Sequence, residues 1–290
     1  MRRGNGVKQM ELSNVGQDTR GAPGSPGSPG SPDETRAAPF LEVSGLDAGY
    51  NRVPVVQGVS IQVALSEVVL VMGPNGAGKS TLVKAITGEL PALAGRVVLD
   101  GRDVTAAREE DRTRAGIGYV PQVRDVFGPL TVVENLQMGG YQLGKHEVAA
   151  RQDEVFSLFP PLAEMRSRLA RSLSGGERKM LAIGRALMAQ PKVMVLDEPT
   201  ANLAPAIARS VLHGIVAGLA GSGRAVLLVE QRVSLGLEVA SWGYVLTDGR
   251  LRLQESCKKL QARPDLGTLF LGHGGGELGS TREEVSQGVG

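Results

Sequence analysis

The sequence predicts an α/β fold built around a parallel sheet, and three observations support this prediction. Runs of apolar residues at 68–72 and 193–196 are typical of strands that are buried on both faces. Segments with helical signals alternate with such runs over much of the chain. A glycine-rich loop joins the run 68–72 to the helix that follows, so strand, loop and helix come in direct succession.

Length and composition fit one large domain with tails, or two small domains. Of the 290 residues, 41% are hydrophobic, which is enough for a sizeable core, and the formal net charge is only +2. So small a charge gives no reason to expect nucleic acid or an anionic membrane as the main partner. Cys257 is the single cysteine, so no internal disulfide can form, which suits a reducing compartment. No apolar stretch reaches the ~18 to 20 residues of a membrane span, and residues 1–6 do not resemble a secretory signal, so we expect a cytoplasmic protein.

Both ends of the chain differ in composition from its middle. Residues 1–37 are polar and include three Gly-Ser-Pro triplets, and residues 273–290 are rich in glycine and charge. Segments with so few large apolar side chains cannot bury a core. We therefore predict a disordered leader at 1–37, an ordered domain at 38–272 and a disordered tail at 273–290.

The predicted domain begins with strands and ends with βα units and a hairpin. Before the helical stretch, the sequence predicts strands near 40–43, 55–56, 59–63, 68–72, 95–101 and 116–122, and a helix that ends near Gly88. After that stretch it predicts strands at 193–196 and 225–229, helices at 175–188 and 205–220, a hairpin around Asp248-Gly249, and a last helix running toward 270–272.

Between these parts, residues 123–172 have a helical character. Thr131 and Glu134 form a capping box, in which each side chain bonds the backbone N–H of the other, and this opens one helix. Residues 147–158 form a second amphipathic run, which Pro160-Pro161 ends. We therefore expect an inserted helical segment here.

The loop after the strand 68–72 is the first candidate site. It matches G-x-x-x-x-G-K-[ST] and consists of Gly73, Pro74, Asn75, Gly76, Ala77, Gly78, Lys79, Ser80 and Thr81. Its glycines let backbone N–H groups approach phosphate oxygens, and the following helix directs its positive end to the same place. Lys79 would then meet the outer phosphates, and the hydroxyl of Ser80 would bind Mg²⁺. The alternative is a glycine-rich turn that happens to contain a lysine.

Two carboxylates follow the apolar strand 193–196, where open α/β sheets place their chemistry. We expect Asp197 to hold Mg²⁺, directly or through water, and Glu198 to polarise an attacking water molecule. The alternative is a turn with two solvated acids. The phosphate loop on a neighbouring strand favours the first interpretation.

A second capping box consists of Ser174, Gly175, Gly176 and Glu177. Its two glycines weaken the helix and leave backbone N–H groups free at a helix N-terminus, where anions bind. This surface is far from the first phosphate loop in the sequence. We therefore infer a nucleotide that is held between two molecules.

Together these motifs resemble those of the ABC (ATP-binding cassette) ATPases. Five occur in the order of that family: 73–80 as Walker A, Gln122 as the Q-loop, 173–177 as the signature, 193–198 as Walker B and 201–205 as the D-loop. The resemblance covers about residues 40–272. It implies a RecA-like P-loop NTPase core with an antiparallel β subdomain and a helical subdomain inserted at about 123–172.

The resemblance also implies how the motifs cooperate. In that family two cassettes dimerise head to tail, and each ATP lies between Walker A of one subunit and the signature of the other. Ser174, Gly175 and Gly176 would contact the γ-phosphate bound by the partner. Gln122 would sense Mg²⁺ and the attacking water, and it would link the site to the helical subdomain. Tyr50 would stack on adenine, although a partly exposed tyrosine at a strand end is the alternative.

Two positions depart from the general family pattern. Gln231 stands where the family has its switch histidine, and Ala204 replaces the D-loop aspartate. Glutamine can hydrogen-bond a γ-phosphate or water, but it cannot become charged. Both departures resemble the LivF-type cassette of branched-chain amino acid importers, as do residues 126–136, 180–188 and 270–272.

The resemblance therefore implies an enzyme that hydrolyses MgATP as a dimer and drives an importer of branched-chain or other hydrophobic amino acids. Its implied partners are a second cassette, identical or not, integral membrane permease subunits and, indirectly, a substrate-binding protein, but no nucleic acid. The chain would then lie at the cytoplasmic face of the membrane. A urea or short-amide importer, an exporter cassette and a soluble ABC ATPase remain as alternatives.

Overall fold

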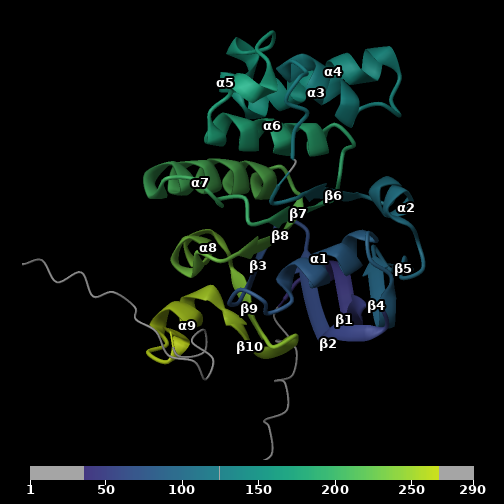
Figure 1. Ribbon diagram of the computed structural model, residues 1–290, viewed down its shortest axis with the longest axis vertical. Helices are drawn as coiled ribbons and strands as arrows, with labels where there is room; N and C mark the ends of the chain where they lie inside the picture. The colour runs from purple at the N-terminus through teal and green to yellow at the C-terminus, as the bar shows by residue number, and fades with distance from the viewer. Residues whose placement is uncertain (1–35, 124, 268–290) are drawn as a thin grey trace, which may run out of the picture.

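The computed structural model describes residues 36–123 and 125–267 and consists of two sheets with helices around them (Figure 1). The leader expected to be disordered at 1–37 lies outside the described residues except for its last two, of which Arg36 forms an ion pair with Glu67 at 2.8 Å. The tail expected at 273–290 and the end of the last predicted helix at 270–272 also lie outside the described residues. The antiparallel sheet has the order β2-β1-β4-β5 and is formed by β1 (Pro39–Tyr50), β2 (Val53–Ala64), β4 (Ala92–Leu99) and β5 (Arg102–Asp103).

The second sheet is mainly parallel and has the order β10-β9-β3-β8-β7-β6. Its strands are β3 (Val68–Met72), β6 (Ile117–Val120), β7 (Val193–Asp197), β8 (Ala225–Glu230), β9 (Trp242–Thr247) and β10 (Arg250–Ser256). Only β10 runs against its neighbour. The predicted α/β class, with a parallel core and a separate antiparallel sheet, is therefore confirmed.

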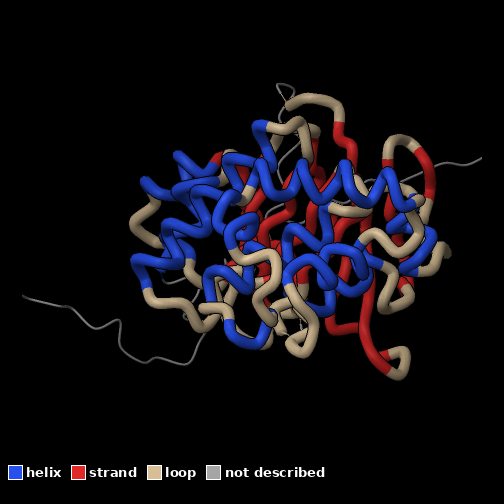
Figure 2. Tube along the Cα trace, turned by 90° about the horizontal axis from the view of Figure 1, so that it is seen from above, coloured by secondary structure: helices blue, strands red, loops and turns tan. Residues whose placement is uncertain are grey.

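In Figure 2 most of the helices lie in front of and beside the strands. They are α1 (Lys79–Thr87), α2 (Glu109–Arg114), α3 (Val132–Gly139), α4 (Lys145–Leu158), α5 (Pro160–Glu164), the 3₁₀ turn η1 (Ala170–Ser172), α6 (Gly175–Leu187), α7 (Pro205–Gly221), α8 (Val233–Val239) and α9 (Cys257–Ala262). Figure 1 shows α3, α4, α5 and α6 gathered at one end of the molecule, with α9 at the other. No helix in the described ranges is long and apolar enough to cross a membrane.

Both faces of the parallel sheet are buried, because alternate residues of its strands join two different apolar clusters. On β3, Leu70 and Met72 pack with residues of α6, α7, α8 and α9. Val69 and Val71 point to the other face and pack with β1, β2, β4 and α1. This explains why β3 and β7 are apolar throughout instead of alternating with polar residues.

Helix ends follow the local signals in the sequence. The P-loop helix α1 starts after Gly78 and stops at Gly88, and both glycines have positive φ angles, of 99° and 87°. The predicted box of Thr131 and Glu134 is present at the start of α3. Pro160 ends α4 and also begins α5, because a proline is well tolerated in the first turn of a helix.

Five elements were not predicted individually, namely α2, α5, the 3₁₀ turn η1, α8 and the two-residue strand β5. The segment of α2 has no apolar residue, so no hydrophobic periodicity marks it. The two strands expected at 55–56 and 59–63 are one strand, β2, whose pairing with β1 is interrupted by register shifts.

The inner face of α2 is formed by an arginine. Arg112 is 1% exposed, and its guanidinium donates to the carbonyls of Ala85 and Ile86 at the last turn of α1, at 2.6 and 2.7 Å. It also donates to the carbonyls of Thr105 and Ala107. Burial lowers the pKa of this guanidinium. The cation lies at the negative end of the α1 dipole and joins α1 to α2.

Replacing this arginine should destabilise the fold. Arg112→Met removes the donors for four carbonyl groups, so we expect the free energy of unfolding to fall by about 2 to 4 kcal/mol. The matched variant Arg114→Met changes an exposed side chain of the same helix and should shift stability by less than about 0.5 kcal/mol. Urea unfolding of both variants measures the difference, and equal midpoints would contradict the role given to Arg112.

Candidate functional site

A cavity of about 410 Å³ lies at the carboxyl-terminal edge of the parallel sheet. It brings together residues from five parts of the chain: β2, the loop and start of α1, and the segments after β6, β7 and β8. Its lining consists of Val55, Asn75, Gly76, Gly78, Lys79, Ser80, Thr81, Gln122, Glu198 and Gln231. The phosphate-loop residues, the residues predicted to act on the attacking water, Gln122 and Glu198, and Gln231, which stands at the position of the family's switch histidine, therefore share one cavity.

Lys79 is the buried cation of this cavity. Its side chain is 5% exposed, and its ammonium group donates to the carbonyls of Gly73 and Pro74 at 2.9 and 3.1 Å. The same nitrogen lies 3.6 Å from Oε1 of Glu198. Two carbonyl groups therefore accept hydrogen bonds from the ammonium group, and one carboxylate forms an ion pair with it. The lysine is held at the loop, where an entering anion would replace the carboxylate of Glu198.

Glu198 is fixed from two sides. Its Oε1 faces Lys79, and its Oε2 accepts a hydrogen bond of 2.8 Å from Nε2 of Gln122. The backbone N–H of Glu198 donates to the carbonyl of Val229 on β8, at 2.8 Å. Its φ angle is 45°, in the left-handed region that is uncommon for residues other than glycine. The turn after β7 therefore adopts an unfavourable backbone conformation that directs this carboxylate into the cavity.

Asp197 lies behind the cavity and does not line it. It is 5% exposed, and its Oδ1 has no hydrogen-bond partner among the described residues. Burial and the neighbouring charge of Glu198 raise its pKa to about 6, although the charges of Lys79 and Lys179 oppose this rise. A buried carboxylate oxygen without a partner is suited to a cation or a bound water molecule.

The oxygen atoms at and behind the cavity could bind Mg²⁺ together with the phosphate oxygens of a bound molecule. No group of three or more His, Cys, Asp or Glu residues within the described part of the chain is arranged to hold a metal. Ser80, Gln122 and Asp197 offer a hydroxyl, an amide oxygen and a carboxylate. Mg²⁺ commonly keeps water and takes one or two protein groups plus phosphate oxygens, which is what this set could supply.

Some residues of the phosphate loop support the cavity without lining it. Gly73 approaches β9 so closely that a Cβ atom there would lie 2.2 Å from the carbonyl oxygen of Leu246. Ala77 is buried, and its carbonyl accepts a hydrogen bond from the N–H of Gly249. Pro74 contributes its carbonyl to Lys79. These contacts fix the loop against β9 and β10.

The second predicted phosphate surface is not part of this cavity. None of Ser174, Gly175, Gly176 and Glu177 lines it, although they form the predicted capping box at the start of α6. The two glycines also have a packing role that the sequence did not reveal. A Cβ atom at Gly175 would lie 2.7 Å from Leu203, and Gly176 is buried against α7. One chain therefore brings together only part of the predicted site.

Of two further predicted site residues, Gln231 lines the cavity and Tyr50 does not. Gln231 lines the cavity directly after β8. Tyr50 ends β1, is 48% exposed and lies outside the lining. Val55, which was not predicted as a site residue, lines the cavity.

Glu230 is a buried charged residue near the site that was not predicted from the sequence, and Lys179 on α6 is another. Glu230 is 1% exposed and accepts hydrogen bonds from the N–H groups of Thr200 and Arg232, at 3.0 and 3.4 Å. Burial raises its pKa. It joins the loop after β7 to the loop after β8. One signal was available, because Glu230, like Asp197, is an acid at the end of an apolar strand.

The chain is similar to known proteins in sequence and in fold. A family described as "ABC transporter" matches residues 56–201. The chain is 39% identical over 223 residues to the high-affinity branched-chain amino acid transport ATP-binding protein BraG of Pseudomonas aeruginosa, covering 77% of this chain and 95% of the relative. It is 38% identical over 233 residues to a probable branched-chain amino acid transport ATP-binding protein, LivF, of Archaeoglobus fulgidus, covering 80% and 99%.

Other matches include a cassette of an export system and a solved structure of a cassette. The chain is 35% identical over 216 residues to the lipopolysaccharide export system ATP-binding protein LptB of Haemophilus influenzae, covering 73% of this chain and 88% of the relative. Among solved structures, the ADP conformation of an ATP-binding cassette of an ABC transporter superposes with a TM-score of 0.74. That pair is 28% identical and covers 81% of this chain and all of the other.

The raised pKa of Asp197 predicts a specific pH dependence of stability. The folded protein holds a proton at Asp197 up to about pH 6, whereas the unfolded chain loses it near 3.8, so wild type loses stability as pH rises between these values. Asp197→Asn cannot titrate and should be more stable than wild type by about 2 kcal/mol at pH 8, with the difference shrinking toward pH 4.

Urea unfolding in metal-free buffer at pH 8 and pH 4.5 measures this difference. Asp153→Asn on α4 changes an exposed aspartate and serves as the control, for which we expect little change at either pH. If Asp197→Asn exceeds wild type in stability by more at pH 4.5 than at pH 8, the pKa of Asp197 is not raised in the folded protein.

Proposed function

The chain belongs to the ABC transporter family as an ATP-binding subunit, and on this basis we propose that it powers the import of branched-chain or other hydrophobic amino acids. As an ATP-binding cassette it is an ATPase coupled to transport. The main support for the amino-acid substrate is the 38–39% identity to two branched-chain amino acid transport cassettes over most of their length. The substrate itself touches other subunits of a transporter, so no residue of this cavity selects it.

ATP would bind with its outer phosphates in the cavity at the P-loop. Lys79 would exchange its contact with Glu198 for phosphate oxygens and meet the charge that develops on the transferred phosphoryl group. The freed carboxylate of Glu198 would accept a hydrogen bond from the attacking water. Gln122, which already contacts Glu198, would orient that water or sense the γ-phosphate. Mg²⁺, when bound, would supply positive charge that offsets the charge of the phosphates, and Ser80, Gln122 and Asp197 would hold it.

A second cassette would complete the site. Ser174 to Glu177 lie outside the cavity of their own chain and form the N-terminus of α6, where backbone N–H groups lie at the end of the helix. We propose that they contact the γ-phosphate held by the partner, while Tyr50 stacks on the adenine. The partner is an identical chain or a companion cassette. Gln231 would hydrogen-bond the γ-phosphate without becoming charged, so its contribution should not change across neutral pH.

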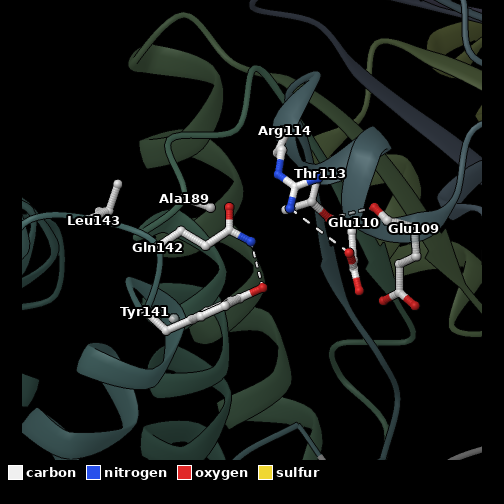
Figure 3. Close-up of a pocket in the computed structure, with 9 residues that line it drawn as sticks. Glu109, Glu110, Thr113, Arg114, Tyr141, Gln142, Leu143 and Ala189 are labelled. Carbon is white, nitrogen blue, oxygen red and sulfur yellow. Dashed lines mark hydrogen bonds and ion pairs between the residues drawn. The ribbon is translucent and has the colours of Figure 1, made fainter.

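A second cavity offers a contact surface for a permease subunit. It has a volume of about 360 Å³ and lies between α2 and the turn that joins α3 to α4 (Figure 3). Glu109 and Glu110 of α2 lie across from Tyr141, whose side chain is 70% exposed. Burial and nearby acids raise the pKa of Glu109, and Arg114 in the same lining pairs with Glu110, so the cavity offers an aromatic ring beside charged side chains. We propose that residues 123–172 form the helical subdomain that passes motion to this partner at the cytoplasmic face of the membrane.

The transport assignment can be tested with complexes isolated from membranes. The tagged chain is purified together with its membrane partners and placed in vesicles, and ATP-driven uptake of labelled leucine and urea is measured. We expect leucine uptake and no urea uptake, with none for Lys79→Ala, and weaker recovery of the permease with Tyr141→Ala. Urea uptake would favour the amide importers, and recovery of no membrane protein would favour a soluble ABC ATPase.

The role of Glu198 predicts a trapped state. Glu198→Gln keeps the side-chain size but weakens the acceptor for the attacking water, so ATP turnover should fall at least about a hundredfold. ATP binding should persist, and the variant should elute as an ATP-bound dimer in size-exclusion chromatography. Glu147→Gln, an exposed change on α4, is the matched control. Hydrolysis by Glu198→Gln at the wild-type rate would mean that another residue activates the water.

A further inference from the structure

Lys179 is a buried charged residue for which the mechanism above has no role. It lies on α6, five residues after Ser174, and is 6% exposed. Its ammonium group lies 2.8 Å from Oδ2 of Asp125, which is 7% exposed itself. This buried ion pair connects α6 to the segment that follows the Q-loop.

The other donors of Lys179 reach the backbone of the Q-loop itself. The ammonium group donates to the carbonyl of Gln122 at 3.0 Å and to that of Pro121 at 3.4 Å. One lysine thus fills its three donor positions with a carboxylate and two carbonyls. The side chain of the same Gln122 donates to Glu198 at 2.8 Å. A continuous set of contacts therefore leads from α6 through Lys179 and Gln122 to Glu198.

The place of Lys179 on α6 decides what this set of contacts can transmit. Gly175 lies four residues earlier, which is about 6 Å along a helix axis. A helix moves nearly as a rigid body, so an anion seated at Ser174–Glu177 that shifts α6 also shifts the ammonium group. Because that group holds the backbone of Gln122, the amide of Gln122 has to follow.

We propose that Lys179, held in place by Asp125, is a positioning residue that couples the start of α6 to the contact between Gln122 and Glu198. Seating of a phosphate at the signature of one chain then adjusts the water-activating carboxylate of that same chain. The proposal rests on ATP hydrolysis at this site, and not on the identity of the transported solute.

The test compares ATP turnover, ATP affinity and melting temperature in purified full-length protein. Lys179→Met removes the ammonium group, so we expect kcat to fall roughly ten- to a hundredfold while KM for ATP changes less than about twofold. Lys179→Arg keeps a charged donor and should restore part of kcat. Lys258→Met, an exposed change on α9, is the matched control and should behave as wild type.

A double-mutant cycle separates positioning from a merely stabilising ion pair. In the background of Gln122→Ala, Lys179→Met should lower kcat by less than about twofold, because its effect passes through Gln122. If Lys179→Met lowers kcat by the same factor with and without Gln122→Ala, the two residues act independently and the proposal is wrong.

A second variant removes both charges of the pair. Asp125→Asn with Lys179→Met leaves no unpaired buried carboxylate, so it should melt closer to wild type than Lys179→Met does, yet its kcat should stay low. Recovery of both melting temperature and kcat would show that the pair only stabilises the fold. This variant also decides the question if Lys179→Met alone does not fold. No uptake assay is involved, so failure of the amino-acid assignment leaves these results unaffected.

Discussion

The parallel register of β3, β8, β7 and β6 is the constraint on which the candidate site depends. Met72 pairs with Glu230, Asp197 with Val229 and Leu196 with Val120, so the four strands end at nearly the same level. Each strand is followed by a site residue or a loop that carries one. Because parallel strands present their carboxyl ends at one edge, the P-loop, Gln122, Glu198 and Gln231 reach one cavity from distant parts of the sequence.

Local signals explain what could be predicted from the sequence. The strands β3 and β7, the order of strand, loop and helix at 68–87, both capping boxes and the glycine that ends α1 were predicted correctly, because each depends on residues within one or two turns of chain. The contacts of Lys179 and Glu230 span 57 and 30 residues and leave no periodic pattern. The helix α2 was missed for a similar reason, since the residue that fixes it to the core is a buried arginine.

The start of α6 shows how one residue type can meet two requirements. Glycine at 175 and 176 was expected because an anion needs free N–H groups at a helix N-terminus. In the structure the same glycines also allow α6 to lie close to Leu203 and α7, where an added Cβ atom would come within 2.7 Å of Leu203 and 3.2 Å of Val211. A change at these positions therefore alters both the phosphate surface and the packing that orients it, so loss of activity alone cannot separate the two causes.

The ion pair of Lys79 and Glu198 affects which anions this protein selects. The lysine already has a carboxylate and two carbonyls as partners, so an entering anion must replace an internal partner instead of filling an empty positive site. A single small anion, such as free phosphate or sulfate, gains little from that exchange. A nucleoside triphosphate makes further contacts with the loop and with α1, and these can outweigh the lost pair. The internal partner of Lys79 thus disfavours a small inorganic anion relative to a nucleoside triphosphate.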